Sequence, residues 1–293
     1  MEREKQIYRV TLAGSVGNAL LVAFKFVAGV AGHSGAMIAD AVHSLSDFVT
    51  DIVVMVFVGI SARPQDRSHD YGHGKFETLA SFFISLALFA AAIGIIVSGA
   101  RKLAIWIEGG DIASPGTIAL WAALISLAVK ELMFRYTDRK GRDLDSPALR
   151  ANAWHHRSDA FSSVGAAVGI GGAVLLGGRW TVLDPLASIV VGAMLIGVAW
   201  KIIRPSLGEL TDESLPEGTE QEIMDVFRSF PEVSQPHNLR TRRIGNRIAI
   251  EAHIRMDGDI TLRHAHGTAS RIERALKEKF GPQTIVTLHM EPV

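Results

Sequence analysis

The chain has 293 residues, 48% of them hydrophobic, with no cysteine and a formal net charge of zero. The hydrophobic content is higher than in an ordinary soluble enzyme, and the zero net charge provides no basic field for a nucleic-acid partner. Because cysteine is absent, disulfides and thiolate metal sites are excluded, and nitrogen and oxygen atoms must hold any metal.

Six apolar segments are long enough, or nearly so, to cross about 30 Å of hydrocarbon. They are expected at residues 7–30, 36–60, 79–107, 117–136, 149–176 and 183–203. Lys and Arg gather before the first segment, after the second, between the fourth and fifth, and after the sixth. This bias predicts that both termini are cytoplasmic. We therefore expect a multi-pass protein of the cell (inner) membrane, surrounded by lipid, whose first segment is a retained anchor and not a signal peptide.

After residue 205 the composition becomes that of a soluble domain. Helices are predicted at residues 214–230 and 262–280, and strands at 238–243, 247–256 and 284–290. The order αββαβ predicts a small α+β domain with helices on one face of a sheet. We therefore predict a six-helix transmembrane domain at 1–205 and a cytoplasmic domain at 206–293, whose exposed sheet face or edge favours a homodimer.

Two apolar segments carry the same short pattern, a His followed four residues later by an Asp. The pairs are His43 with Asp47 and His155 with Asp159. Residues i and i+4 share one helical face, and ionisable groups inside a membrane usually serve ions or protons. Two nitrogens and two oxygens complete a tetrahedral shell for Zn²⁺, and they also admit Fe²⁺, Co²⁺ or Mn²⁺. The alternative is hydrogen bonding between helices without a metal.

Other charged residues lie in the same apolar segments. Asp40 and Asp51 share the face of His43 and Asp47. Asp40 is an exit or proton group, and Asp51 serves either access to the site or helix packing. Three more either pair with these carboxylates or snorkel to the membrane surface: Lys25, Lys130 and Glu131.

Two further groups of residues have the composition of metal sites. After the second segment, a glycine-containing loop holds Asp66, His69 and His73 at close spacing. A solvated polar loop is the alternative. In the soluble domain, a set of histidines either converges across the sheet or is scattered over the surface: His237, His253, His264, His266 and His289.

Four motifs together resemble the cation diffusion facilitator family over essentially the whole chain: HSLSD, HHRSD, the D-x-x-H-x-x-x-H-G-K loop and HNLRTR in the tail. The likeness is greatest to the bacterial zinc/iron exporter subgroup, which is a Y-shaped homodimer with a metallochaperone-like tail.

The resemblance implies a transport site at His43, Asp47, His155 and Asp159, and a loop site at Asp66, His69 and His73. It implies a tail zinc site at His237, His253, His266 and His289, with Glu291 where the subgroup has aspartate. Lys75 and Asp212 match an interlock pair that joins the membrane domain to the tail across the dimer.

The resemblance implies Zn²⁺/H⁺ antiport out of the cytoplasm by alternating access, with zinc as substrate and as a structural or regulatory ligand. The subgroup usually has aspartate where His43 stands, and the His₂Asp₂ set is similar to that of zinc-dedicated members. The alternatives are Fe²⁺, Cd²⁺, Co²⁺ or Mn²⁺ as main substrate, or a metal sensor that does not transport. An enzyme is not expected, since HExxH and GxSxG are absent and four protein ligands leave no open position for water.

Overall fold

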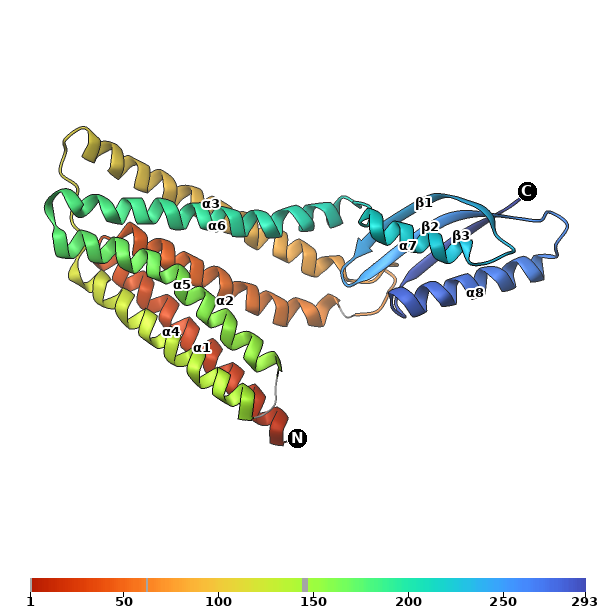
Figure 1. Cartoon of the computed structure of the whole chain (residues 1–293), viewed down its shortest axis with the longest axis horizontal. Helices are drawn as coiled ribbons and strands as arrows, with labels where there is room; N and C mark the ends of the chain where they lie inside the picture. The colour runs from red at the N-terminus through yellow and green to blue at the C-terminus, as the bar shows by residue number, and fades with distance from the viewer. Residues whose placement is uncertain (1, 62, 144–146) are drawn as a thin grey trace. The chain divides into compact units, whose positions relative to one another are not determined.

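A computed structural model of the chain describes residues 2–61, 63–143 and 147–293, and some side chains of α1, α2 and α5 lie outside this description. Six long helices come first (Figure 1). They are α1 (Glu2–Ala31), α2 (Gly35–Ser61), α3 (Lys75–Ile107), α4 (Thr117–Asp143), α5 (Pro147–Leu176) and α6 (Leu183–Leu210), with a short 3₁₀ helix η1 (Gly178–Val182) before α6. The tail follows as α7 (Glu217–Arg228), β1 (Ser234–Ile244), β2 (Arg247–Met256), α8 (Leu262–Phe280) and β3 (Ile285–Pro292).

The chain divides into two compact units. One contains Met1–Ile52 and Ile84–Lys201, and the other contains Val53–Phe83 and Ile202–Val293. The loop between α2 and α3 therefore belongs to the same unit as the tail. The predicted domain boundary at residue 205 stays a prediction, although α6 continues through Pro205 to Leu210.

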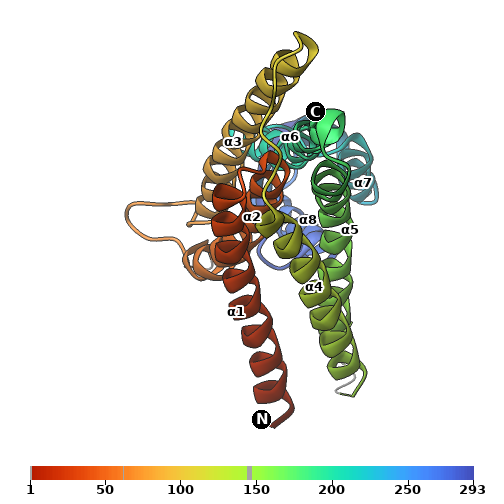
Figure 2. The same ribbon diagram turned by 90° about the vertical axis from the view of Figure 1, so that its left-hand side faces the viewer.

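Small residues form the core of the helical unit. Ala28 on α1, Ala36 on α2, Ala122 on α4 and Ala166 on α5 are buried together, and α4 packs against both α1 and α5 (Figure 2). Helices in a membrane pack closely where side chains are small. This core brings α2 and α5, which carry the two His–Asp pairs, into one bundle.

The start of α2 is fixed by a carboxylate from another helix. Asp184, in the first turn of α6, accepts hydrogen bonds from the hydroxyl of Ser34 and from the amides of Gly35 and Ala36. The Ser34 hydroxyl in turn accepts from the amide of Met37. The free N–H groups at the start of a helix need such partners, and the negative charge also suits the helix dipole.

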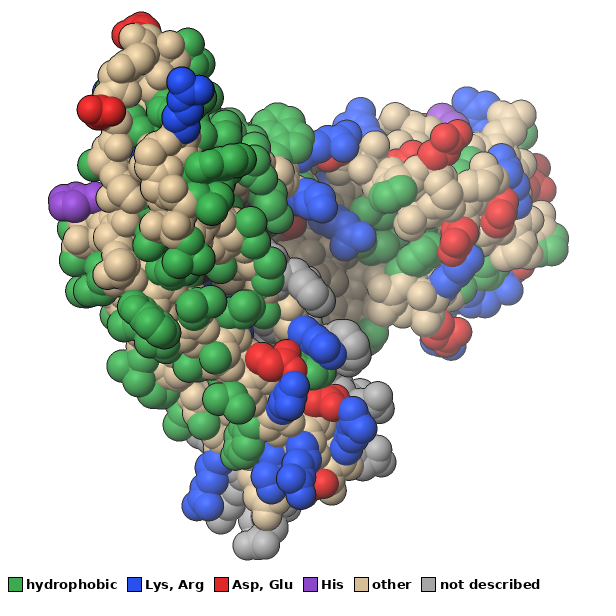
Figure 3. All heavy atoms as spheres, turned by 60° about the vertical axis from the view of Figure 1, so that its left-hand side comes forward, with side chains coloured by type: hydrophobic (Ala, Val, Ile, Leu, Met, Phe, Trp, Pro, Cys, Tyr) green, Lys and Arg blue, Asp and Glu red, His purple; other side chains and the backbone are tan. Residues whose placement is uncertain are grey.

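The helical unit has the surface of a membrane protein. Among the described residues, four helical stretches are long and apolar enough to cross a membrane: Leu12–Ala31, Lys75–Ile107, Thr117–Asp143 and Gly178–Leu210. Hydrophobic side chains cover much of the bundle surface (Figure 3), including Leu20, Trp121, Val168 and Val190. The expectation of a helical transmembrane domain followed by an α+β tail is confirmed.

The tail has a three-stranded sheet in the order β1-β2-β3. β1 and β2 are antiparallel, whereas β2 and β3 are parallel. Ile223 and Phe227 of α7 and Ile272 and Leu276 of α8 pack with Ile250 of β2 in the tail core. The start of α7 differs from the expected Ser214, because the extended Pro216 takes the N-cap position and makes no side-chain cap bond.

Candidate metal centres

The first centre joins the two His–Asp helices. His43 and Asp47 of α2 and Asp159 of α5 each offer a ligand atom, and these atoms lie within 4.8 Å of one another. The Nε2 atom of His43 is 3.9 Å from Oδ2 of Asp47, as the i,i+4 spacing on one helical face requires. One imidazole and two carboxylates therefore converge inside the helical unit, a donor set that suits a divalent cation.

Two features of this centre bear on a fourth ligand. The Nδ1 atom of His43 is buried and has no hydrogen-bond partner within the described part of the chain. His155 lies on α5, four residues before Asp159, but its side chain is outside the described residues, as is that of Asp51. The assignment of His155 as a ligand therefore stays a prediction.

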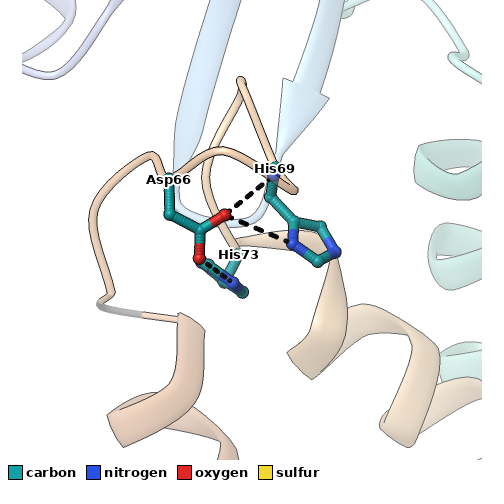
Figure 4. Close-up of side chains that lie close together, drawn as sticks. All are labelled: Asp66, His69 and His73. Atoms are coloured by element: carbon teal, nitrogen blue, oxygen red, sulfur yellow. Dashed lines mark hydrogen bonds and ion pairs between the residues drawn. The ribbon is translucent and has the colours of Figure 1, made fainter.

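The second centre lies in the loop before α3. Asp66, His69 and His73 again place one ligand atom each within 4.8 Å of one another (Figure 4). Nε2 of His73 is 3.4 Å from Oδ2 of Asp66, and Nδ1 of His69 is 3.8 Å from Oδ1. The two imidazole rings lie 4.4 Å apart. The loop is therefore folded so that these three side chains face one another.

Local hydrogen bonds stabilise the ionised form of the Asp66 carboxyl group. The hydroxyl and the amide of Ser68 and the amide of His69 donate to its Oδ1 atom. These bonds, led by that of the Ser68 hydroxyl, lower the pKa of Asp66 to about 2. The carboxylate is thus ionised at any physiological pH, which is the state that binds a cation.

The third centre spans the three strands of the tail. His237, His253 and Glu291 form the cluster, and His289 lies beside it, with its ring 4.7 Å from that of His253. The sheet register explains the meeting, because His237 pairs with His253 and His253 pairs with His289. Nδ1 of His253 contacts Oε1 of Glu291 at 2.8 Å. The predicted ligand His266 is not part of this cluster in the described chain.

Sequence reasoning missed one member of this centre, Arg255. Its Nε atom donates to Oε2 of Glu291 at 3.4 Å. Together with the bond from His253, which is the larger cause, it lowers the pKa of Glu291 below its ordinary value. The signal was present, since Arg255 is two residues from His253 on β2 and side chains alternate along a strand.

The predicted interlock pair also forms in this unit. Nζ of Lys75 is 2.7 Å from Oδ1 of Asp212, and Arg242 contacts the other carboxylate oxygen at 3.4 Å. The pair forms here within one chain, whereas the sequence resemblance implies a contact across a dimer.

Two family models match the chain almost end to end. The cation efflux transmembrane domain matches residues 11–211, and the cytoplasmic domain of cation efflux proteins matches residues 215–293. The chain belongs to the cation diffusion facilitator family. This facilitator is a multi-pass membrane protein, and its family carries out efflux of divalent metal cations.

Similar proteins cover most of the facilitator. The manganese efflux system protein MneP of Bacillus subtilis is 30% identical, over 99% of this chain and 98% of the relative. Metal tolerance protein C1 of Arabidopsis thaliana is 34% identical, over 99% of this chain and 63% of that relative. Among solved structures, the metal-bound C-terminal domain of the CzcD transporter from Thermotoga maritima is 30% identical, covering 27% of this chain and 94% of that one with a TM-score of 0.24.

Proposed function

We propose that this facilitator exports Zn²⁺ from the cytoplasm in exchange for protons. The proposal rests on the meeting of His43 with Asp47 and Asp159. The two carboxylates offset the charge of a divalent cation in a site of low dielectric. The imidazole nitrogen favours Zn²⁺ over Mn²⁺, which prefers oxygen ligands. His155 is the proposed fourth ligand.

Proton exchange follows from the chemistry of the same ligands. Imidazole is the side chain whose charge ordinarily changes near physiological pH. A metal requires the neutral ring, so binding releases protons and protons compete with the metal. Rocking of helix groups around the fixed site would then expose it alternately to the cytoplasm and to the outside. We place both termini in the cytoplasm and the protein in the inner membrane.

We assign sensing roles to the other two centres. The loop centre at Asp66, His69 and His73 would bind zinc in the unit that contains the tail. The tail centre at His237, His253, His289 and Glu291 would bind regulatory zinc in a homodimer. His266 lies outside that centre in one chain, so a second copy is its proposed source. Zinc bound between subunits would favour one dimer geometry over others.

The test is metal flux into proteoliposomes under a pH gradient. The wild type should move Zn²⁺ and counter-transport protons, while Asp47→Ala should lose at least about 99% of the flux, since an ion pathway residue inside a membrane is not replaceable by a methyl group. Asp143→Asn, at the exposed end of α4, is the matched carboxylate control and should keep wild-type flux. If Asp47→Ala transports zinc at the wild-type rate, the site assignment is wrong.

The main competing substrate is manganese, because the relative MneP is named for manganese efflux. Iron, cadmium and cobalt are the other candidates. Running the same assay with each metal decides among them, and flux of no metal at all would favour a sensor that does not transport.

A further inference from the structure

The helical unit contains a buried charge pair that belongs to none of the metal centres. Lys25 of α1 has no solvent exposure, and Asp40 of α2 is 2% exposed. The Nζ atom of Lys25 lies 2.6 Å from Oδ2 of Asp40. A buried ammonium is costly unless it is paired and hydrogen-bonded. Lys25 therefore pairs with Asp40 and does not snorkel to the membrane surface.

Two serines complete the arrangement. Nζ of Lys25 donates to Oγ of Ser44 at 3.0 Å and contacts Oγ of Ser163 at 3.4 Å. Ser163 donates to the other oxygen of Asp40 at 2.7 Å. One ammonium from α1 therefore connects two points on α2 with one on α5. These four residues, Lys25, Asp40, Ser44 and Ser163, are called the Lys25 cluster below.

The Lys25 cluster lies on one side of the first metal centre. Asp40 precedes His43 on α2, and Ser163 follows Asp159 on α5 by four residues, with its hydroxyl 3.3 Å from the Asp159 carbonyl oxygen. Both displacements point toward the end of the bundle where α2 begins, at the turn after α1. The buried core of Ala36, Met37, Ala166 and Ile170 continues in that direction.

A second lysine is buried in the same unit. Lys130 of α4 is 3% exposed, and its Nζ atom has no hydrogen-bond partner within the described residues. A metal cation that moved from the centre toward the α1–α2 turn would approach the ammonium of Lys25 in a dry environment.

We propose that the Lys25 cluster is the barrier between the transport centre and the end of the bundle at the α1–α2 turn, an inference that rests on the proposed function. Lys25 acts as a positioning residue: it holds α1 against the two ligand helices and repels cations from that route. The cluster has to come apart before a metal can leave by that end, which requires α1 to move away from α2 and α5. The four residues do not bind the transported ion.

The absence of cysteine from the chain permits a direct test. Asp47→Cys puts a single thiol in the transport centre. The full-length protein is reconstituted, and thiol reagents that cannot cross the membrane are added on the side of the α1–α2 turn, one cationic and one anionic. The thiol should react slowly with both. Adding Lys25→Met should raise the rate of reaction with the cationic reagent by at least about tenfold more than the rate with the anionic one, as expected when a positive charge beside the route is removed. Lys25→Arg should keep both reactions slow.

A second variant guards against misfolding. Lys25→Met leaves Asp40 as an uncompensated buried charge, which is strongly destabilising, so Lys25→Met with Asp40→Leu removes both charges together. Because this double variant leaves the net charge of the route unchanged, it should accelerate the reactions of both reagents. Unchanged rates in both variants, or equal acceleration of both reagents by Lys25→Met alone, would overturn the proposal. The labelling requires no metal, so it stands apart from the zinc flux of Asp47→Ala, whose persistence would overturn the proposed function alone.

Discussion

At the scale of single residues, the proposed preference for zinc at the first metal centre depends on His43. It supplies the one nitrogen that the described part of the centre contains, beside the oxygens of Asp47 and Asp159. Because imidazole suits Zn²⁺ and carboxylate suits Mn²⁺, the side chain at this position sets the balance between nitrogen and oxygen ligands.

We therefore expect His43→Asp to shift selectivity from zinc toward manganese. The ratio of Zn²⁺ to Mn²⁺ flux should fall by about tenfold, which corresponds to about 1.4 kcal/mol of differential binding. Paired flux measurements on the same proteoliposome preparation give this ratio directly. His264→Asp, on the exposed start of α8, is the control and should leave the ratio unchanged. An unaltered ratio in His43→Asp would show that selectivity is set elsewhere.

The sequence predicted which candidate ligands lie close together better than it predicted their surroundings. The i,i+4 spacing is a property of a single helix, so the spacing alone places His43 and Asp47 on one face, and the repeat of the motif predicted Asp159 beside them. The contact of Lys25 with Asp40, Ser44 and Ser163 depends on how three helices rotate against one another. That rotation follows from the packing of small residues such as Ala28 and Ala166, and no spacing rule encodes it.

At the scale of elements, an irregularity in β1 creates the tail centre. The hairpin register pairs Arg240 with Glu251, and an uninterrupted strand would set His237 opposite Ile254. A register shift between His237 and Arg240 sets His237 opposite His253 instead. Because side chains alternate along a strand, a shift by one residue moves a side chain to the other face. The histidine spacing alone could not predict this meeting.

Asn238 is the residue in β1 that accommodates the shift. Its φ of 50° lies in the left-handed region, which Asn and Gly adopt far more readily than β-branched residues. We expect Asn238→Val to destabilise the tail by about 1–2 kcal/mol, the usual cost of such backbone strain, and to weaken zinc binding there. Hydrogen exchange of β1 amides in the full-length protein, with zinc titration, measures both effects.

The control for this prediction is Asn238→Gly. It also loses the contact between Asn238 and Nε2 of His253, but it keeps the backbone conformation at no steric cost. A Val variant as stable as the Gly variant would show that the left-handed conformation does not hold the register.

At the scale of the whole molecule, the loop centre and the tail act as one body. Lys75 and Asp212 join them directly, and Arg242 lies over the ring of Tyr71 at 5.0 Å. The backbones approach so closely that a Cβ on Gly74 would lie 2.6 Å from the carbonyl oxygen of Ile244. Zinc at Asp66, His69 and His73 would therefore bind a segment already attached to the tail, which argues that the loop and tail centres respond together.

The stabilisation that the Lys75–Asp212 ion pair contributes should depend on pH. The hydrogen bond from Lys75, followed by the charges of Lys75 and Arg242, lowers the pKa of Asp212 below its ordinary value of 3.8. A lowered pKa means that the stabilisation is complete above the ordinary value and is lost as the pH falls through the folded-state value. The attachment of loop to tail should therefore be constant across physiological pH.

Asp212→Asn isolates this charge, because asparagine tolerates the φ of 58° that Asp212 adopts. At pH 7 we expect the variant to lose about 0.5 kcal/mol of unfolding free energy, the usual contribution of an exposed ion pair, and this difference should vanish in acid below the folded-state pKa. Thermal unfolding of the full-length protein across that range measures it, and the double variant with Lys75→Met gives the coupling energy of the pair. A difference that persists unchanged in acid, or additive effects of the two substitutions, would show that the pair does not join loop to tail. A coupling energy that is present at neutral pH and lost in acid would instead identify the ion pair of Lys75 and Asp212 as the joint between the loop and the tail.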